Sequence, residues 1–322
     1  MLPLFAGTAL LFAAAIGYYC LKQFGISMNE PVTALRILSI VFPVMAVVLV
    51  GWFYARRRAA DMTTANETNM DVFVPALVFS ALADRSFDLA GHWAFAIGAF
   101  LMIVGSGLIA WLVARFANVE PRVLVPTAMF NNNGNLGLPL ALLAFGDEGL
   151  AAAVVMFMVS NLAHFSFGSW YLDRHAKWWN VWRYPVILAA LAGLAVSFSG
   201  FEIWEPLRVA IKMLGDVSIP LALFALGVRI AQSRVTAFRV GFIGAIVRPA
   251  AGIMIMWIFA VLLGLQGEQK AMLIIFGALP PAVINYVFAE RYNQGPDEVS
   301  AIVLIGNIAA VLVIPVVLAV VL

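Results

Sequence analysis

Long apolar runs separated by short polar segments dominate the hydrophobic pattern of this chain. A helix that crosses the hydrocarbon core of a bilayer needs about 20 predominantly apolar residues. The runs that approach or exceed this length are 3–21, 37–55, 67–83, 93–114, 123–146, 149–172, 184–201, 209–228, 237–264, 271–289 and 299–322. Because backbone polar groups inside lipid must be satisfied within the segment, we expect each run to be helical.

The composition agrees with a membrane location. The 322 residues are 64% hydrophobic and 11% charged, with a mean hydropathy of +0.99, whereas soluble domains are about 25% charged. The net charge of +2 is spread over the loops, which gives no reason to expect nucleic acid as a partner. A single cysteine excludes a disulfide framework within the chain, and three dispersed histidines lack metal-ligand spacing. We expect the lipid bilayer as a partner and no metal or cofactor.

Two stretches of the chain share Asp, Val, Pro and Phe at matching places and indicate an internal duplication. Residues 71–79 have the sequence DVFVPALVF, and residues 216–224 have the sequence DVSIPLALF. With 1–36 set aside as an extra N-terminal helix and linker, five predicted spans fall in 37–178 and five in 179–322. An odd number of crossings turns the second group upside down, so the halves are predicted to be inverted-topology repeats, as in many secondary carriers.

The distribution of Lys and Arg predicts the orientation. The loops on one side of the predicted membrane hold more Lys and Arg residues than those on the other side, and such an excess marks the cytoplasm. This places the C-terminus outside the cytoplasm, in a multi-pass protein of the cell (plasma or inner) membrane. The run 3–21 has no Lys or Arg ahead of it, which favours an additional spanning helix with a cytoplasmic N-terminus over a cleaved signal peptide.

Two of the predicted spans contain residues that weaken a helix at mid-membrane. Residues 131–139 have the sequence NNNGNLGLP inside an otherwise apolar run, and residues 279–286 have the sequence LPPAVINY in the middle of another. Carboxamides at bilayer depth are costly when unpaired, and Gly and Pro weaken the helical hydrogen bonding. We expect both helices to break here and to cross near Pro139 and Pro281.

Broken helices that cross at mid-membrane present their N-termini to a common space. Helix N-termini offer unpaired N–H groups and the positive end of the helix dipole, which favour a carboxylate. The alternative interpretations are interhelical hydrogen bonding for the Asn cluster and a simple kink for the proline pair. The candidate substrate-binding residues are Asn131, Asn132, Asn133, Asn135, Pro139, Pro281, Asn285 and Tyr286.

Three further polar residues are candidates for supporting roles. Asn161 and Asn307 occupy matching places in 149–172 and 299–322, where we expect them to brace the broken helices. Arg248 is a charge inside the predicted span 237–264. Such a charge either serves function, by holding an anion or a carboxylate partner, or extends to the membrane surface.

These motifs resemble the auxin efflux carrier family, which includes plant PIN-type auxin exporters and bacterial organic-anion permeases. Residues 132–139, NNGNLGLP, are similar to the family's N-T-G-x-x-G-x-P stretch. Residues 281–292, PAVINYVFAERY, resemble a second family motif, which starts with Pro and ends in A-[K/E]-x-Y. The resemblance covers 38–322 and implies that Asn132 contacts a substrate carboxylate. Asn285 is a departure, because plant members have a proline there.

The resemblance also implies a fold and a mechanism. The implied fold is an all-α integral membrane bundle of 5+5 inverted repeats with crossed broken helices, as in bile-acid and sodium/proton antiporter-like carriers. The implied scaffold comprises 37–55, 67–83, 184–201 and 209–228, and the other spans of the two repeats form a transport domain that moves by elevator-type alternating access. Homodimerisation through the scaffold is implied as well.

A secondary transporter of small organic anions is the function that these features favour. A membrane receptor or sensor that binds an anion without moving it, and an anion channel, are the alternatives. Broken-helix sites are more typical of alternating access than of pores. An enzyme is disfavoured, because the sequence shows no paired catalytic carboxylates, no His-Glu motif and no Ser-His arrangement.

Overall fold

The computed structural model describes residues 30–83, 92–175, 182–199, 201–233 and 236–322, and almost all of them are helical. The elements, in chain order, are α2 (Glu30–Arg57), α3 (Thr63–Thr68), η1 (Asn69–Phe73), α4 (Val74–Leu82), α5 (Trp93–Ala117), α6 (Pro121–Met129), η2 (Asn133–Gly137), α7 (Leu138–Ala163), η3 (His164–Gly168), α8 (Ser169–Leu172), α9 (Pro185–Ser199), α10 (Glu205–Gln232), α11 (Phe238–Leu262), α12 (Gly267–Ala278), α13 (Ile284–Arg291) and α14 (Pro296–Val321). The η elements are short π-helical turns.

The prediction of a helical, multi-pass membrane protein is confirmed. Among the described residues, six helical segments are long and apolar enough to cross a membrane, namely Leu35–Arg57, Trp93–Ala117, Asn133–Leu172, Glu205–Gln232, Phe238–Leu262 and Pro296–Val321. Helix α9 is apolar but shorter. The remaining predicted spans correspond to shorter helices in series, such as α12 followed by α13. The predicted span 3–21 lies outside the described residues.

Two boundaries differ from a simple reading of the apolar runs. Helix α2 begins at Glu30, within the stretch predicted as a linker, because Pro31 in the first turn is compatible with a helix that needs no N–H there. The long segment Asn133–Leu172 changes direction at Gly146, which has φ 68° and ψ −155°. Glycine adopts such a conformation without the steric cost that a side chain brings, so the predicted runs 123–146 and 149–172 have different directions.

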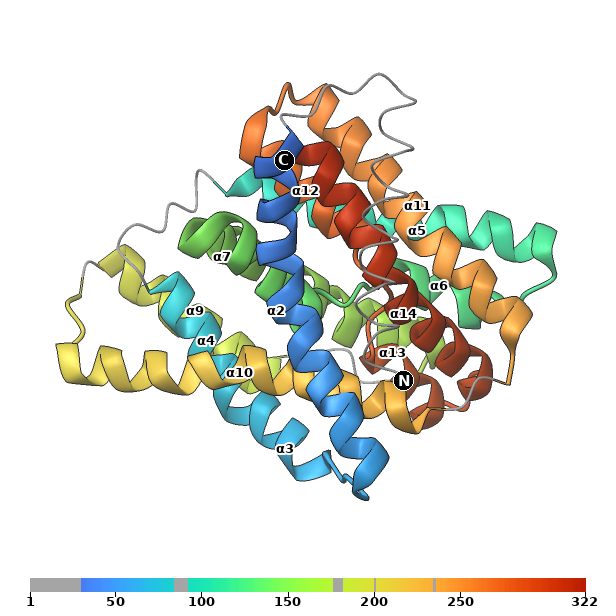
Figure 1. Ribbon diagram of the computed structural model, residues 1–322, viewed down its shortest axis with the longest axis horizontal. Helices are drawn as coiled ribbons and strands as arrows, with labels where there is room; N and C mark the ends of the chain where they lie inside the picture. The colour runs from blue at the N-terminus through green and yellow to red at the C-terminus, as the bar shows by residue number, and fades with distance from the viewer. Residues whose placement is uncertain (1–29, 84–91, 176–181, 200, 234–235) are drawn as a thin grey trace.

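Helices α2 and α10 cross at close range, as Figure 1 shows. A Cβ atom at Gly227 would lie 1.9 Å from the carbonyl oxygen of Val48, and one at Gly51 would lie 2.1 Å from that of Phe224. Small residues at a crossing let the backbones of membrane helices approach closely, and this contact is a main source of their association.

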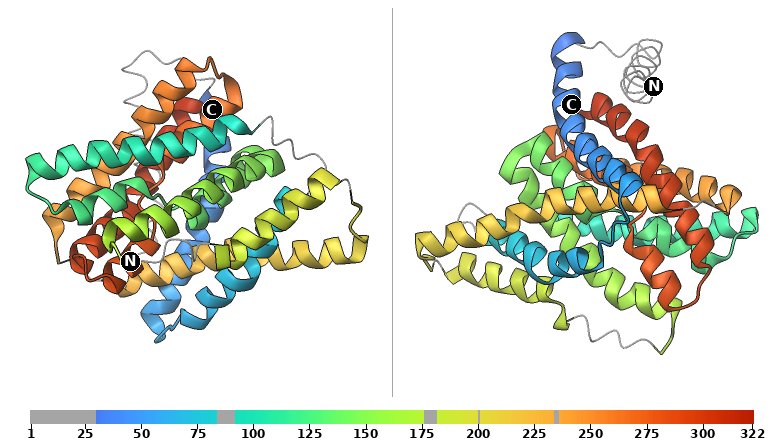
Figure 2. Two further views of the ribbon diagram at one scale, coloured as in Figure 1. Left: turned by 180° about the vertical axis from the view of Figure 1, so that it is seen from behind. Right: turned by 60° about the horizontal axis from the view of Figure 1, so that its bottom comes forward.

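The helices form two groups of neighbours around α7. Helices α4, α9 and α10 lie side by side along one edge of the molecule, and α2 packs on α10 (Figure 2). Helices α5, α6, α11, α12 and α14 pack on one another and contribute most of the larger apolar core. A second apolar core joins α4 and α9 to α7.

The duplicated stretches have different local structures. Residues 71–79 span the junction of η1 and α4, whereas residues 216–224 lie inside the uninterrupted helix α10, with Pro220 in its interior. Proline removes one helical hydrogen bond and favours a kink or a break. In this chain, similar sequence therefore does not fix the same hydrogen-bonding pattern in the two places.

Candidate functional site

Two interrupted stretches of backbone meet in the interior of the molecule. Helix α6 ends at Met129 and helical structure resumes with η2 at Asn133, while α12 ends at Ala278 and α13 begins at Ile284. Between them, Asn131 and Pro281 form an isolated antiparallel bridge. The N–H of Asn132 donates to the Pro280 carbonyl at 2.7 Å, and that of Ala282 donates to the Phe130 carbonyl at 2.9 Å.

We call this contact between residues 130–132 and 280–282 the junction. Its hydrogen bonds satisfy backbone groups that an interrupted helix leaves without partners, which is necessary where water is excluded. Pro281 lies in the junction, but Pro139 lies in the first turn of α7, beyond η2. The predicted crossing near Pro139 is therefore wrong for that half, since a proline in a first helical turn does not break the helix.

Asn131 and Asn285 fasten the two interrupted segments to each other. Asn131, which is 1% exposed, donates from Nδ2 to the Phe276 carbonyl near the end of α12 at 2.8 Å. Asn285, which is 2% exposed, donates to the Phe130 carbonyl just after α6 at 3.0 Å. Each amide adds a second hydrogen bond to a carbonyl at a helix end of the opposite segment, because the Phe130 carbonyl also accepts from Ala282 and the Phe276 carbonyl from Leu279.

Asn132 is tied to Asn307 rather than exposed to the surface. Its Nδ2 atom donates to Oδ1 of Asn307 at 2.8 Å. Asn307 in turn donates to the Pro281 carbonyl at 3.0 Å and to the Val303 carbonyl of its own helix at 2.8 Å. Asn307 therefore links α14 to both sides of the junction.

Polar groups without partners gather at the start of η2. The buried Nδ2 of Asn133 has no hydrogen-bond partner among the described residues. Asn135 is half-buried, and no described residue hydrogen-bonds its side chain or the backbone N–H groups of residues 133–135. The η2 turn packs against α10. These groups are hydrogen-bond donors at a helix N-terminus, which is a suitable environment for an anion.

Asn161 does not brace the interrupted helices. Its Nδ2 atom donates to the Phe157 carbonyl of its own helix at 2.8 Å, and it makes no side-chain hydrogen bond to another element within the described ranges. The sequence match with Asn307 predicted equivalent roles, and that expectation is wrong for Asn161. Donation to the carbonyl four residues earlier is a local alternative open to a small polar side chain in a helix.

Arg248 is a buried cation behind the junction. Its side chain is 0% exposed, so the interpretation that it extends to the membrane surface is wrong. Nη1 donates to the Gly277 carbonyl at 3.1 Å, and Nη2 lies 3.4 Å from the sulfur of Met102. No carboxylate of the described residues forms an ion pair with Arg248. The guanidinium thus stabilises the C-terminal end of α12, where a positive charge is favourable.

An aromatic cluster supports the junction from another side. The imidazole of His164 stacks on the ring of Phe130 with centroids 3.9 Å apart and an interplanar angle of 6°. The same imidazole meets Phe288 edge to face at 4.7 Å. A lone histidine in an apolar run gave no signal for this role in the sequence, because the contact joins η3 to segments far away along the chain.

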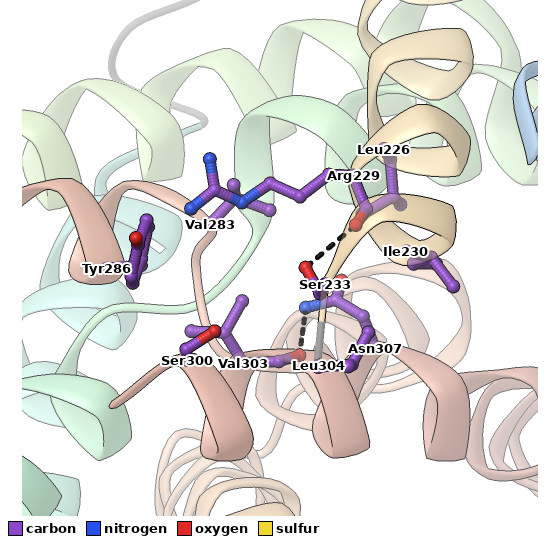
Figure 3. Close-up of a pocket in the computed structure, with 10 residues that line it drawn as sticks. All are labelled: Leu226, Arg229, Ile230, Ser233, Val283, Tyr286, Ser300, Val303, Leu304 and Asn307. Atoms are coloured by element: carbon purple, nitrogen blue, oxygen red, sulfur yellow. Dashed lines mark hydrogen bonds between the residues drawn. The ribbon is translucent and has the colours of Figure 1, made fainter. Parts of the chain in front are cut away.

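A small pocket lies beside the junction. Figure 3 shows its lining, which comes from α10, α14 and the stretch around α13, and the Arg229 side chain extends across it towards the Tyr286 ring. The guanidinium carbon lies 4.3 Å from the ring centroid, a cation–π distance. Asn307 also lines the pocket. Arg229 comes directly after the predicted span 209–228, which is the usual place for a surface cation, so its position in the sequence does not indicate this contact.

The helical architecture and the buried polar junction define a polytopic membrane protein, and the comparison with known families makes this more specific. The model of the family described as "Membrane transport protein" matches residues 36–172 and 172–318. The chain belongs to this family of membrane transporters, the auxin efflux carrier family.

Two relatives match most of the chain, and a third matches a shorter part of it. An uncharacterized transporter of Methanocaldococcus jannaschii is 22% identical over 86% of this chain and 96% of its own length. A Rhizobium meliloti protein named "Putative malonate transporter" is 25% identical over 86% of this chain and 93% of its own length. Auxin efflux carrier component 6 of Arabidopsis thaliana is 30% identical over 40% of this chain, which corresponds to 24% of the plant protein.

Proposed function

We propose that this protein is a secondary transporter of small organic anions, and that it moves carboxylates by elevator-type alternating access. The observation that carries this proposal is the group of unpaired donors at the start of η2, next to the junction and against α10. A carboxylate accepts such hydrogen bonds and complements the positive end of a helix dipole. The printed name of the Rhizobium relative refers to malonate, which is a small dicarboxylate.

The proposed fold consists of two inverted five-helix repeats, 37–178 and 179–322, whose interrupted helices cross at the junction. The two matches of the family model, which meet at residue 172, support this division. In this proposal, α2, α3 to α4, α9 and α10 form the scaffold, and the other helices form the transport domain. The two groups of neighbouring helices in the structure support that assignment.

The candidate site residues take two roles in this proposal. Asn131, Asn132, Pro281 and Asn285 set the shape of the junction, because their polar groups bond the opposite segment. Asn133 and Asn135 at the start of η2 are the proposed donors to the anion, and Tyr286 lines the neighbouring pocket on its path. Pro139 lies in the first turn of α7, directly after η2.

Counterflow in proteoliposomes tests transport and separates it from the alternatives. Vesicles with the purified protein are preloaded with unlabelled malonate, and the uptake of dilute labelled malonate is followed over time, with succinate, butyrate and benzoate tested in parallel. A carrier accumulates label transiently above its equilibrium level. Equilibration without this overshoot would indicate a channel, and saturable binding without flux would indicate a receptor or sensor.

A crosslink between the two groups of helices tests the elevator motion. Ile230 of α10 and Leu304 of α14 line the same pocket, so cysteines at both positions, in a Cys20→Ser background, can be joined by a flexible bismaleimide. We expect the crosslink to stop counterflow while leaving the protein folded. A crosslink between Val48 and Phe224 positions, inside the proposed scaffold where α2 meets α10, is the control that should leave flux unchanged. Full flux through the Ile230–Leu304 crosslink would remove the elevator mechanism.

A further inference from the structure

We propose that Arg229 is the cation that recognises the carboxylate of the substrate, in the pocket between α10, α13 and α14. This proposal rests on the proposed function and assigns the charge recognition to one residue. Arg229 is half-buried and lines the pocket. Its guanidinium stacks on Tyr286 and forms neither a side-chain hydrogen bond nor an ion pair with any residue that the structure describes.

A half-buried guanidinium without a hydrogen-bond partner is unusual, because it carries five N–H donors in a planar fork. The fork matches a carboxylate, which accepts two parallel charge-assisted hydrogen bonds. Stacking on the Tyr286 ring orients the fork without using its donors, since the ring contacts the guanidinium face. Figure 3 shows the guanidinium extended over the pocket rather than folded back on α10. The residue is therefore arranged to receive an anion.

Other groups in the pocket define what kind of anion fits. The Ser300 hydroxyl has no hydrogen-bond partner in the described part of the chain and offers a second donor. The Asn307 amide already bonds Asn132, Pro281 and Val303. The Tyr286 hydroxyl donates to the Glu290 carboxylate. The Glu290 carboxylate also interacts electrostatically with the Arg229 guanidinium. Glu290 is exposed, so solvent screens both this attraction and the repulsion of an incoming anion.

The lining of the pocket indicates the character of the substrate. The rest of the lining consists of Ser233, whose hydroxyl donates to the Arg229 carbonyl, and of the apolar residues Leu226, Ile230, Val283, Val303 and Leu304. This combination suits a short carboxylate whose charged end meets Arg229 while its methylene groups contact the aliphatic wall.

The position of Arg229 also gives it a place in the transport cycle. It lies on α10, in the proposed scaffold, whereas Ser300 and Tyr286 belong to the proposed transport domain. An anion bound between them contacts both parts. Movement of the transport domain past α10 would break the contact with Arg229, so this residue recognises the anion in one of the two access states.

Binding measurements on the purified full chain test the assignment. The variants are Arg229→Gln, Arg229→Lys and, as a control, Arg58→Gln, which removes an exposed charge on the same predicted side. The probes are malonate, butyrate and the uncharged malonamide, measured by calorimetric titration. We expect Arg229→Gln to raise the Kd for malonate about tenfold or more, and Arg229→Lys to raise it less, because lysine keeps the charge but loses the bidentate fork. Arg58→Gln should leave the Kd unchanged.

The outcomes separate this inference from the proposed function. Wild-type Kd values in both Arg229 variants, with counterflow intact in the wild-type protein, would overturn the role of Arg229 and leave transport standing. Binding of malonamide as tight as that of malonate would also overturn it. Should Arg229→Gln fail to fold, an unchanged Kd in Arg229→Lys is sufficient to overturn it. Absence of both binding and counterflow of every probe in the wild-type protein would remove both proposals.

Discussion

The hydrogen bond between Asn132 and Asn307 allows us to predict how much the free energy of unfolding falls when the junction is perturbed. Replacement Asn307→Ala removes two bonds to other segments, one from Asn132 and one to the Pro281 carbonyl. The third bond, to Val303, lies within α14, and the Val303 carbonyl also serves the regular helical ladder. Only the first two bonds therefore contribute substantially to the effect of the replacement.

The magnitude follows from the environment of these bonds. Side-chain hydrogen bonds between membrane helices contribute about 0.6 kcal/mol on average and at most about 1.7 kcal/mol. Two such bonds give a loss of about 1–3 kcal/mol in the free energy of unfolding for Asn307→Ala. A larger loss is possible only through the unpaired groups left behind, because Asn307 is 5% and Asn132 is 3% exposed.

A double-mutant cycle measures the shared bond directly. The free energy of unfolding is determined for the wild-type protein, Asn132→Ala, Asn307→Ala and the double variant, by reversible unfolding with sodium dodecyl sulfate in mixed micelles. We expect the double variant to lose less than the sum of the single losses, by about 0.6–1.7 kcal/mol. Asn161→Ala is the matched control, because its amide bonds only its own helix, and it should cost about 0.5 kcal/mol or less.

Additive losses would refute the reasoning. Residues without a shared interaction usually show additivity within about 0.3–0.5 kcal/mol. If the loss in the double variant equals the sum of the two single losses within this margin, the amide of Asn132 does not form a hydrogen bond with Asn307. An Asn161→Ala loss as large as that of Asn307→Ala would equally contradict the argument, since it would give a local bond the same weight as a bond across the junction.

Two further predictions concern packing and the buried cation. Gly227→Val should prevent stable packing of α2 on α10, because its Cβ atom would lie 1.9 Å from the Val48 carbonyl oxygen. We expect this variant to aggregate in size-exclusion chromatography. Gly105→Ala is the control and should elute as the wild type, because its Cβ atom would meet only a flexible side chain. Arg248→Ala should lower the free energy of unfolding by about 2–4 kcal/mol through a cavity and an unpaired Gly277 carbonyl. Arg248→Met should cost much less, because it fills the space and removes a buried charge; equal losses in the two variants would contradict this.

The sequence predicted the class of the protein and the polar residues better than their contacts. The NNNGNLGLP and LPPAVINY stretches directed attention to two segments that the structure brings together at Asn131 and Pro281. Pro139 and Asn161 show the limit of the approach. A proline is compatible with a first helical turn, and an asparagine can bond its own helix, so residue type alone does not specify the partner.

The apolar runs by themselves determined that this chain is helical and embedded in a membrane, because lipid offers the backbone no hydrogen-bond partners. They also identified where polar side chains interrupt the apolar pattern. Only the tertiary structure decided that Asn132 meets Asn307 and that Arg229 reaches the Tyr286 ring. These contacts join residues far apart along the chain, and their geometry depends on how whole helices pack, which no local pattern in the sequence encodes.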